Sequence, residues 1–135
     1  MTVRPFEFAL LLLAVIQTTG SSRAVQWGDQ ALQQPPAWYA SPDARAMADS
    51  VIQYQSPQGG WPKNTDLETP PRSPRDVPSP GDGRANTIDN GATTTPVRFL
   101  ALVAHATRDS RYREAFERGV RYLLAAQYPN GASES

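Results

Sequence analysis

Apolar residues recur every three or four positions in three stretches of the chain, which is the spacing of one helix face. The first stretch predicts a helix from Pro42 to about Gln55, with Ser41 as its N-cap. The second predicts a helix over 96–107 that is apolar on nearly every face and therefore buried on most sides. The third predicts a helix over 111–127 with one apolar stripe.

Short polar residues mark where these helices begin. Thr95 before Pro96 predicts the start of the second helix, and Asp109 or Ser110 caps the third. Gly119 lies on the apolar stripe of the third helix, where a missing side chain favours close approach of another helix or of backbone.

A Gln-x-Pro-polar-Gly pattern follows both outer helices, at 55–59 and again 72 residues later at 127–131. A helix, a turn and a loop at a fixed period predict a repeating α-helical barrel. Three helices cannot close such a barrel, and the second has no predicted partner for part of its apolar surface. We therefore expect residues 41–135 to form the N-terminal part of an all-α domain, an incomplete α/α toroid-like helical barrel with long irregular loops.

The N-terminal 24 residues have the pattern of an export signal. Arg4 precedes a short apolar run from Phe8 to Ile16, and Ser22-Arg23-Ala24 suits cleavage. The run is too short to span a membrane, although an N-terminal anchor or a buried helix is the alternative. We expect a secreted protein, extracellular or periplasmic, with no membrane association after cleavage.

Two stretches have no helical period. Residues 25–40 contain Pro35-Pro36 among glutamines and aromatic residues, and we expect a linker or an irregular lead-in. Residues 65–84 contain five prolines and four acids and predict a mobile loop whose acids face water.

Charge and cysteine content exclude some classes of protein. Cleavage after Ala24 would remove two basic residues and one acidic residue from a neutral chain, which leaves a net charge of −1. A nucleic-acid-binding surface needs a basic excess, so we expect no nucleic-acid partner. The chain has no cysteine, so stability comes from burial without disulfides.

Two polar motifs flank the proline-rich stretch. In the first, Gly59 to Asn64, glycines and prolines surround Trp61 and predict a rigid turn that presents Trp61, Lys63 and Asn64. Lys63 is the only lysine of the chain. The alternative is a helix C-terminal turn with Trp61 folded back onto the core.

The second motif runs from Asn86 to Phe99 and places Asp89, Asn90 and three threonines, Thr93 among them, just before a helix. Oxygen-bearing side chains at this density suit a hard cation or a hydroxylated ligand. The alternative is a well-capped junction between a loop and a helix.

Three motifs occur in this order in the sequence. They are Gly59-Gly60-Trp61-Pro62-Lys63-Asn64, Thr87-Ile88-Asp89-Asn90-Gly91-Ala92-Thr93-Thr94 and Tyr122-Leu123-Leu124-Ala125-Ala126-Gln127-Tyr128-Pro129-Asn130-Gly131. Together they resemble the N-terminal part of the family 10 polysaccharide lyases, which are secreted pectate lyases, over about Ala40 to Gly131. The resemblance implies an α/α toroid-like fold and calcium-dependent β-elimination of polygalacturonate.

The resemblance also implies roles for individual residues. Asp89 would bind Ca²⁺ or act at the substrate carboxylate, and Lys63 would pair with a uronate carboxylate. Asn90 and Thr93 would be oxygen ligands or hydrogen-bond partners of the sugar. Asn64 would bind substrate or position Lys63. Trp61 would either stack on a sugar ring or support the loop.

The family is thought to use an arginine as base, which we expect beyond Ser135. The family continues with Gly-Trp-Pro where this chain has Ala132-Ser133-Glu134-Ser135. We therefore expect an incomplete, monomeric piece of a pectate lyase that acts on pectin, or on its polygalacturonate backbone. The alternatives are a non-catalytic remnant that binds oligogalacturonate and a plain helical interaction domain.

Overall fold

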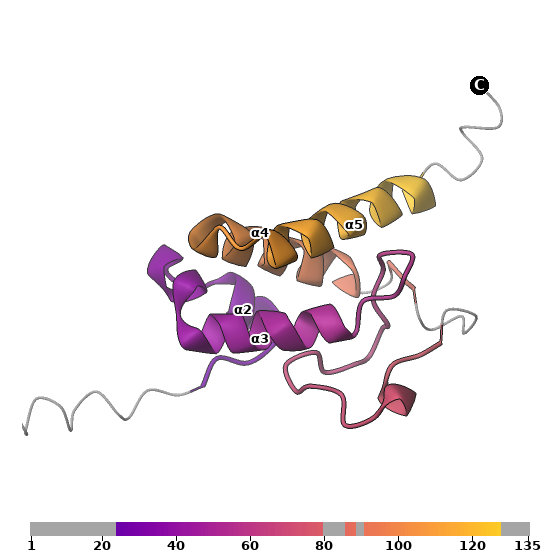
Figure 1. Ribbon diagram of the computed structural model, residues 1–135, viewed down its shortest axis with the longest axis horizontal. Coiled ribbons are helices and arrows are strands. Elements are labelled where there is room, and N and C mark those ends of the chain that lie inside the picture. Colours follow the sequence, from indigo (N-terminus) through magenta and orange to yellow (C-terminus); the bar gives the residue numbers. More distant parts are fainter. Residues whose placement is uncertain (1–23, 80–85, 89–90, 128–135) are drawn as a thin grey trace, which may run out of the picture.

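The computed structural model describes residues 24–79, 86–88 and 91–127, and over this part of the chain it is helical without strands (Figure 1). The predicted all-α fold class is therefore confirmed. The elements in chain order are α2 (Asp29–Leu32), the 3-10 helix η2 (Pro36–Ala40), α3 (Pro42–Gln53), the 3-10 helix η3 (Pro74–Asp76), α4 (Thr94–Thr107) and α5 (Ser110–Gln127).

Helix α3 begins as predicted and ends slightly early. Ser41 Oγ accepts a hydrogen bond from the Ala44 N–H at 3.2 Å, which satisfies one of the free donors of the first turn. The last helical residue is Gln53, two before the predicted end. The Gln55 N–H bonds back to the Ile52 carbonyl at 3.1 Å, so the chain leaves the helix through a tighter turn.

Helices α4 and α5 form an antiparallel hairpin (Figure 1). Helix α4 starts at Thr94, so its N-cap is Thr93 and the predicted cap at Thr95 is wrong. The Thr93 side chain makes no cap hydrogen bond, because its hydroxyl is used elsewhere. Asp109 Oδ1 accepts from the Arg111 N–H at 2.9 Å, so Asp109 is the side chain that caps α5.

Helix α4 lies at the centre of the core, where it contacts α2, η2, α3 and α5. Phe99, Leu100 and Val103 have no exposed surface, as expected for a helix buried on most sides, although Leu102 is 39% exposed. A Cβ placed on Gly119 of α5 would lie 2.5 Å from Val97 Cγ2. The predicted close approach at this glycine is therefore confirmed.

The lead-in, residues 25–40, differs from the expected linker or irregular segment. Ala31 of α2 is fully buried, and its carbonyl accepts a hydrogen bond from the Tyr39 hydroxyl at 2.8 Å. Trp27 and Tyr39 both meet the Phe99 ring, with ring centroids 5.3 and 6.2 Å apart. The aromatic side chains therefore pack the lead-in against α4. The hydrophobic pattern of residues 25–40 alone does not predict this contact.

The segment after α3 is anchored at its beginning. Leu67 is 2% exposed, and its carbonyl accepts from Ser50 Oγ at 2.6 Å. The Tyr54 hydroxyl donates to the Thr69 carbonyl at 2.7 Å, and Ser73 with Asp76 forms a capping box around η3. The mobility expected for 65–84 stays a prediction, and residues 80–85 lie outside the described part.

No helix in the described part of the chain is long and apolar enough to cross a membrane. The predicted signal segment, residues 1–24, lies almost wholly outside the described residues, so the signal peptide stays a prediction.

Candidate functional site

The loop after α3 is a tight turn closed by its own backbone. The Gly59 N–H donates to the Ser56 carbonyl, and the Ser56 N–H donates to the Gly60 carbonyl, both at 2.9 Å. Gly59 has φ +106°, a conformation that L side chains rarely adopt, and a Cβ there would collide with the Arg118 carbonyl of α5. The pair of glycines therefore lets the turn rest directly on α5.

Trp61 holds this loop in the core. Its side chain has no exposed surface, and its indole N–H donates to the Val51 carbonyl of α3 at 2.8 Å. Burial of an indole needs such a partner, because an unpaired buried donor costs about 1–3 kcal/mol. Trp61 is therefore the fixed point from which Pro62, Lys63 and Asn64 emerge.

Trp61 also joins the loop to the second polar motif. Its carbonyl accepts from the Thr87 N–H at 3.2 Å, and its own N–H donates to Thr93 Oγ1 at 3.0 Å. Thr93 Oγ1 in turn donates to the Thr87 carbonyl at 2.6 Å. One buried hydroxyl thus links two motifs that lie 32 residues apart.

Asn86 makes a second junction between the motifs. Its side-chain oxygen accepts from the Gly60 N–H at 3.1 Å and from the Ser56 hydroxyl, and its amide donates to Gln58 Oε1 at 3.2 Å. Gln55 ties the turn to α5, because its side-chain amide donates to the Gly59 carbonyl and to the Ala115 carbonyl of α5. The Gly59–Asn64 loop and the start of the second motif therefore form one hydrogen-bonded unit.

A pocket of about 440 Å³, here called the motif pocket, opens beside this unit. It takes residues from the lead-in, from the loop after Trp61 and from the start of α4. The lining residues are Trp27, Gly28, Asp29, Pro62, Lys63, Asn64, Thr65, Leu67, Gly91, Ala92, Thr95 and Pro96.

Lys63 and Asn64, both predicted to contact substrate, are exposed and line the motif pocket. Asn64 has φ +55°, in the left-handed region that asparagine tolerates better than most residues. Held in this region, Asn64 turns the chain immediately after Lys63. The structure therefore brings these two predicted site residues together in one pocket.

Trp61 and Thr93 do not line the motif pocket. Both have no exposed surface, and the Thr93 hydroxyl already donates to Thr87 and accepts from Trp61. A sugar cannot stack on a ring that no solvent reaches. Of the two roles predicted for Trp61, support of the loop fits the structure, and Thr93 is likewise placed for support instead of direct ligation.

Asp89 and Asn90 lie outside the described residues, so their predicted roles stay predictions. In the sequence they come directly before Gly91, which lines the motif pocket.

A calcium site is not built from the described residues alone. Ca²⁺ takes six to eight oxygen ligands, usually several of them carboxylates. Over residues 24–79, 86–88 and 91–127, no three acidic or histidine side chains come together in a way that could hold a metal ion. Asp29 is the one acid among the described residues that line the motif pocket. A calcium site at Asp89 would therefore need further oxygen ligands besides Asp89.

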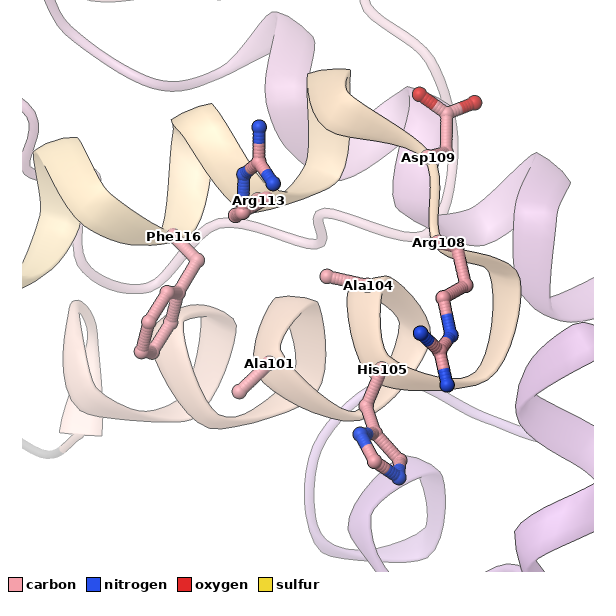
Figure 2. A pocket seen from close by; sticks show the side chains of 7 residues that line it. All are labelled: Ala101, Ala104, His105, Arg108, Asp109, Arg113 and Phe116. Atoms are coloured by element: carbon pink, nitrogen blue, oxygen red, sulfur yellow. The ribbon is translucent and has the colours of Figure 1, made fainter.

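A second pocket, of about 420 Å³, lies at the turn between α4 and α5 and shares no residue with the predicted site (Figure 2). Its apolar lining comes from Ala101 and Ala104 of α4 and Phe116 of α5, while charged groups come from the turn and from Arg113 of α5. His105 is exposed at its edge. The motifs do not meet here, so we assign the site to the motif pocket.

Sequence reasoning missed three supporting residues of the site, Gln55, Ser56 and Asn86. All three were visible as parts of polar motifs, but each also bonds to a partner at least 26 residues away. Asn86 could have been identified from the sequence, because it is the first residue of the second motif. An amide side chain can cross-link two backbone segments because it both donates and accepts.

Comparisons with known proteins identify a family for this chain. The pectic acid lyase family model matches residues 55–134. The solved structure of a family 10 polysaccharide lyase from Cellvibrio cellulosa resembles this chain with a TM-score of 0.52 and 29% identity, over 81% of this chain and 32% of that one. No curated protein sequence matches.

The chain thus spans 32% of the length of that solved lyase chain, and the likeness agrees with the predicted helical toroid-type fold. The family match covers more than half of the chain and includes both motifs that build the pocket. The chain therefore belongs to the pectic acid lyase family.

Proposed function

We propose that the protein binds polygalacturonate through the motif pocket and takes part in its cleavage by β-elimination, with Ca²⁺ as cofactor. Membership of the pectic acid lyase family supports a lyase, and the likeness to a family 10 polysaccharide lyase supports a polysaccharide substrate.

The observation that carries the proposal is the cross-link between the two motifs. The hydrogen bonds of Trp61 and Thr93 fix the loop from which Lys63 and Asn64 line one pocket. A lysine on a fixed backbone suits a uronate carboxylate, because a charge-assisted hydrogen bond to a carboxylate is about twice as strong as a neutral one. Asn64 adds an amide that can donate to a ring oxygen or hydroxyl.

β-Elimination on a uronate needs its carboxylate neutralised. A base removes the proton from C5, the electron pair forms a double bond between C4 and C5, and the bond from C4 to the glycosidic oxygen breaks. The oxygen leaves with a proton, and the new chain end is an unsaturated uronate. Lys63 would assist by offsetting the negative charge that accumulates on the carboxylate as the proton leaves.

Calcium would supply the same neutralisation more strongly when bound. Asp89 is the predicted ligand, and the substrate carboxylate would be another. The described residues do not complete such a site, so chelation is the decisive test: loss of product with a chelator, and its return when Ca²⁺ is restored, is the expected result. Product formation that a chelator leaves unchanged would refute the role of calcium.

Secretion and a monomeric state complete the proposal, with pectin as partner. Secretion is supported by the apolar Phe8–Ile16 segment of the sequence.

The test of the site compares Lys63→Gln with Arg75→Gln, which removes an exposed cation outside the motif pocket. Oligogalacturonate binding is measured by calorimetry, and product by the absorbance of the unsaturated uronate. We expect Lys63→Gln to weaken binding about tenfold, from the loss of one charged hydrogen bond. Equal binding by the two variants would contradict the assignment of the site.

A non-catalytic binding role is the second candidate. It is favoured by one observation: among the described residues that line the motif pocket, Asp29 and Lys63 are the only ones with ionisable side chains. Binding of oligogalacturonate without any unsaturated product would support this candidate. Absence of binding would instead support a plain helical interaction domain.

A further inference from the structure

One wall of the motif pocket comes from the lead-in. Trp27, Gly28 and Asp29, here called the lead-in wall, line the same cavity as Lys63 and Asn64. They precede the segment that matches the family, which begins at residue 55. None of the motifs that indicated a lyase contains them.

The lead-in wall is fixed in place at both ends. The Trp27 N–H donates to Glu68 Oε2 at 2.7 Å, across 41 residues of sequence, and its indole meets Phe99 edge to face. On the other side, Ala31 is fully buried and its carbonyl is held by the Tyr39 hydroxyl. Asp29 therefore lies on a backbone that is tied down before and after it.

The pocket brings two opposite charges together. Lys63 and Asp29 are both exposed, and both line the cavity. A carboxylate only accepts hydrogen bonds, whereas an ammonium group only donates them. A ligand that fits between them should present an acidic group to one and hydroxyl donors to the other.

A galacturonate ring has this polarity. Its carboxylate stands on C5, and its free hydroxyls on C2 and C3 lie on the other side of the ring. A carboxylate of the protein accepts hydrogen bonds from such hydroxyls but repels the uronate carboxylate.

We propose that Asp29 is a specificity-determining residue that accepts a hydrogen bond from a C2 or C3 hydroxyl while Lys63 pairs with the carboxylate. This inference rests on the proposed function of the motif pocket. The two contacts fix which way round a uronate enters, and they disfavour sugars whose C2 or C3 oxygen is acetylated, since an acetylated oxygen has no proton to donate.

The experiment titrates the full chain with trigalacturonate and with the same trimer acetylated at O2 or O3. The test variants are Asp29→Ala and Asp29→Asn, the second of which keeps the size of the side chain and removes its charge. The matched control is Asp43→Ala, because Asp43 is also an exposed acid in the first turn of a helix and does not line the motif pocket.

We expect the unmodified protein to bind the free trimer about tenfold more tightly than the acetylated one. Asp29→Ala should remove that preference by weakening only the free trimer, Asp29→Asn should reduce it, and Asp43→Ala should keep it. Circular dichroism and urea unfolding confirm that the variants fold.

Two kinds of result would overturn the inference and are distinguishable. If the unmodified protein binds neither trimer, the proposed function fails and the inference falls with it. If it binds but shows no preference, or Asp29→Ala keeps the preference, Asp29 makes no contact that discriminates between the trimers. If Asp29→Ala binds the free trimer more tightly, Asp29 acts only as a repelling charge. In each of these cases the inference fails while the proposed function stands.

Discussion

Replacement of Thr93 by valine tests whether one buried hydroxyl holds the site together. Valine keeps the β-branched shape of threonine and removes only the hydroxyl. That hydroxyl accepts from the Trp61 N–H at 3.0 Å and donates to the Thr87 carbonyl at 2.6 Å, in a side chain with no exposed surface. The variant therefore leaves a buried donor and an acceptor without their partner.

The magnitude follows from these two hydrogen bonds. Each contributes about 0.5–1.5 kcal/mol net, and a buried group left unpaired costs about 1–3 kcal/mol. We expect Thr93→Val to lower the free energy of unfolding by about 2–3 kcal/mol. Thr93→Ser keeps the hydroxyl and loses one methyl group, so it should cost only about 1 kcal/mol. Thr94→Val is the matched control, since the neighbouring Thr94 is exposed, and it should change stability by less than about 0.5 kcal/mol.

Urea unfolding of the four proteins, followed by tryptophan fluorescence, measures these differences. Because the hydroxyl fixes the backbone that presents Lys63, Thr93→Val should also weaken oligogalacturonate binding, whereas Thr94→Val should not. The reasoning would be refuted if Thr93→Val and Thr94→Val were equally stable, or if Thr93→Ser were as unstable as Thr93→Val.

Two further predictions concern the core. Gly119→Ala should lower the free energy of unfolding by about 1 kcal/mol, because the new Cβ would lie 2.5 Å from Val97 Cγ2. This overpacking outweighs the better helix propensity of alanine. A variant that is more stable to urea than the unmodified protein would contradict this prediction and show that Val97 shifts at little cost. Burial, with the 2.7 Å hydrogen bond to Asp49, raises the pKa of Tyr112 to about 12 from 10.0. The stabilisation from protonated Tyr112 is therefore complete below pH 10 and is lost as the pH rises towards 12. Between pH 10 and 12, urea unfolding should show a smaller decline in the free energy of unfolding for Tyr112→Phe than for the unmodified protein.

The three long helices were predictable from the sequence because their information is local. An apolar stripe at spacing three or four identifies a helix that covers a core, and a short polar side chain such as Ser41 or Asp109 satisfies the free N–H groups where a helix begins. The errors lie at the ends. Thr93 and not Thr95 is the N-cap of α4, and only the distant contacts of the Thr93 hydroxyl explain why it forms no cap hydrogen bond.

The site was predictable as a set of motifs but not as a geometry. The glycines and prolines around Trp61 predicted a rigid turn. The resemblance of the motifs to a lyase family indicated the type of reaction. The sequence left open whether Trp61 faces solvent or folds back onto the core. It did not decide that Trp61 is buried while Lys63, two positions later, is exposed, because burial depends on which segments fold over the loop.

The sequence by itself therefore determined the helices, the family and the pair of loops that carry the polar residues. Only the tertiary structure decided which residues support the pocket and which line it, and that the lead-in forms one of its walls. The physical reason is range: helix periodicity and capping act within a few residues, whereas the Trp61–Thr93 and Trp27–Glu68 hydrogen bonds join segments 32 and 41 residues apart. Such contacts exist only once the core has brought those segments together.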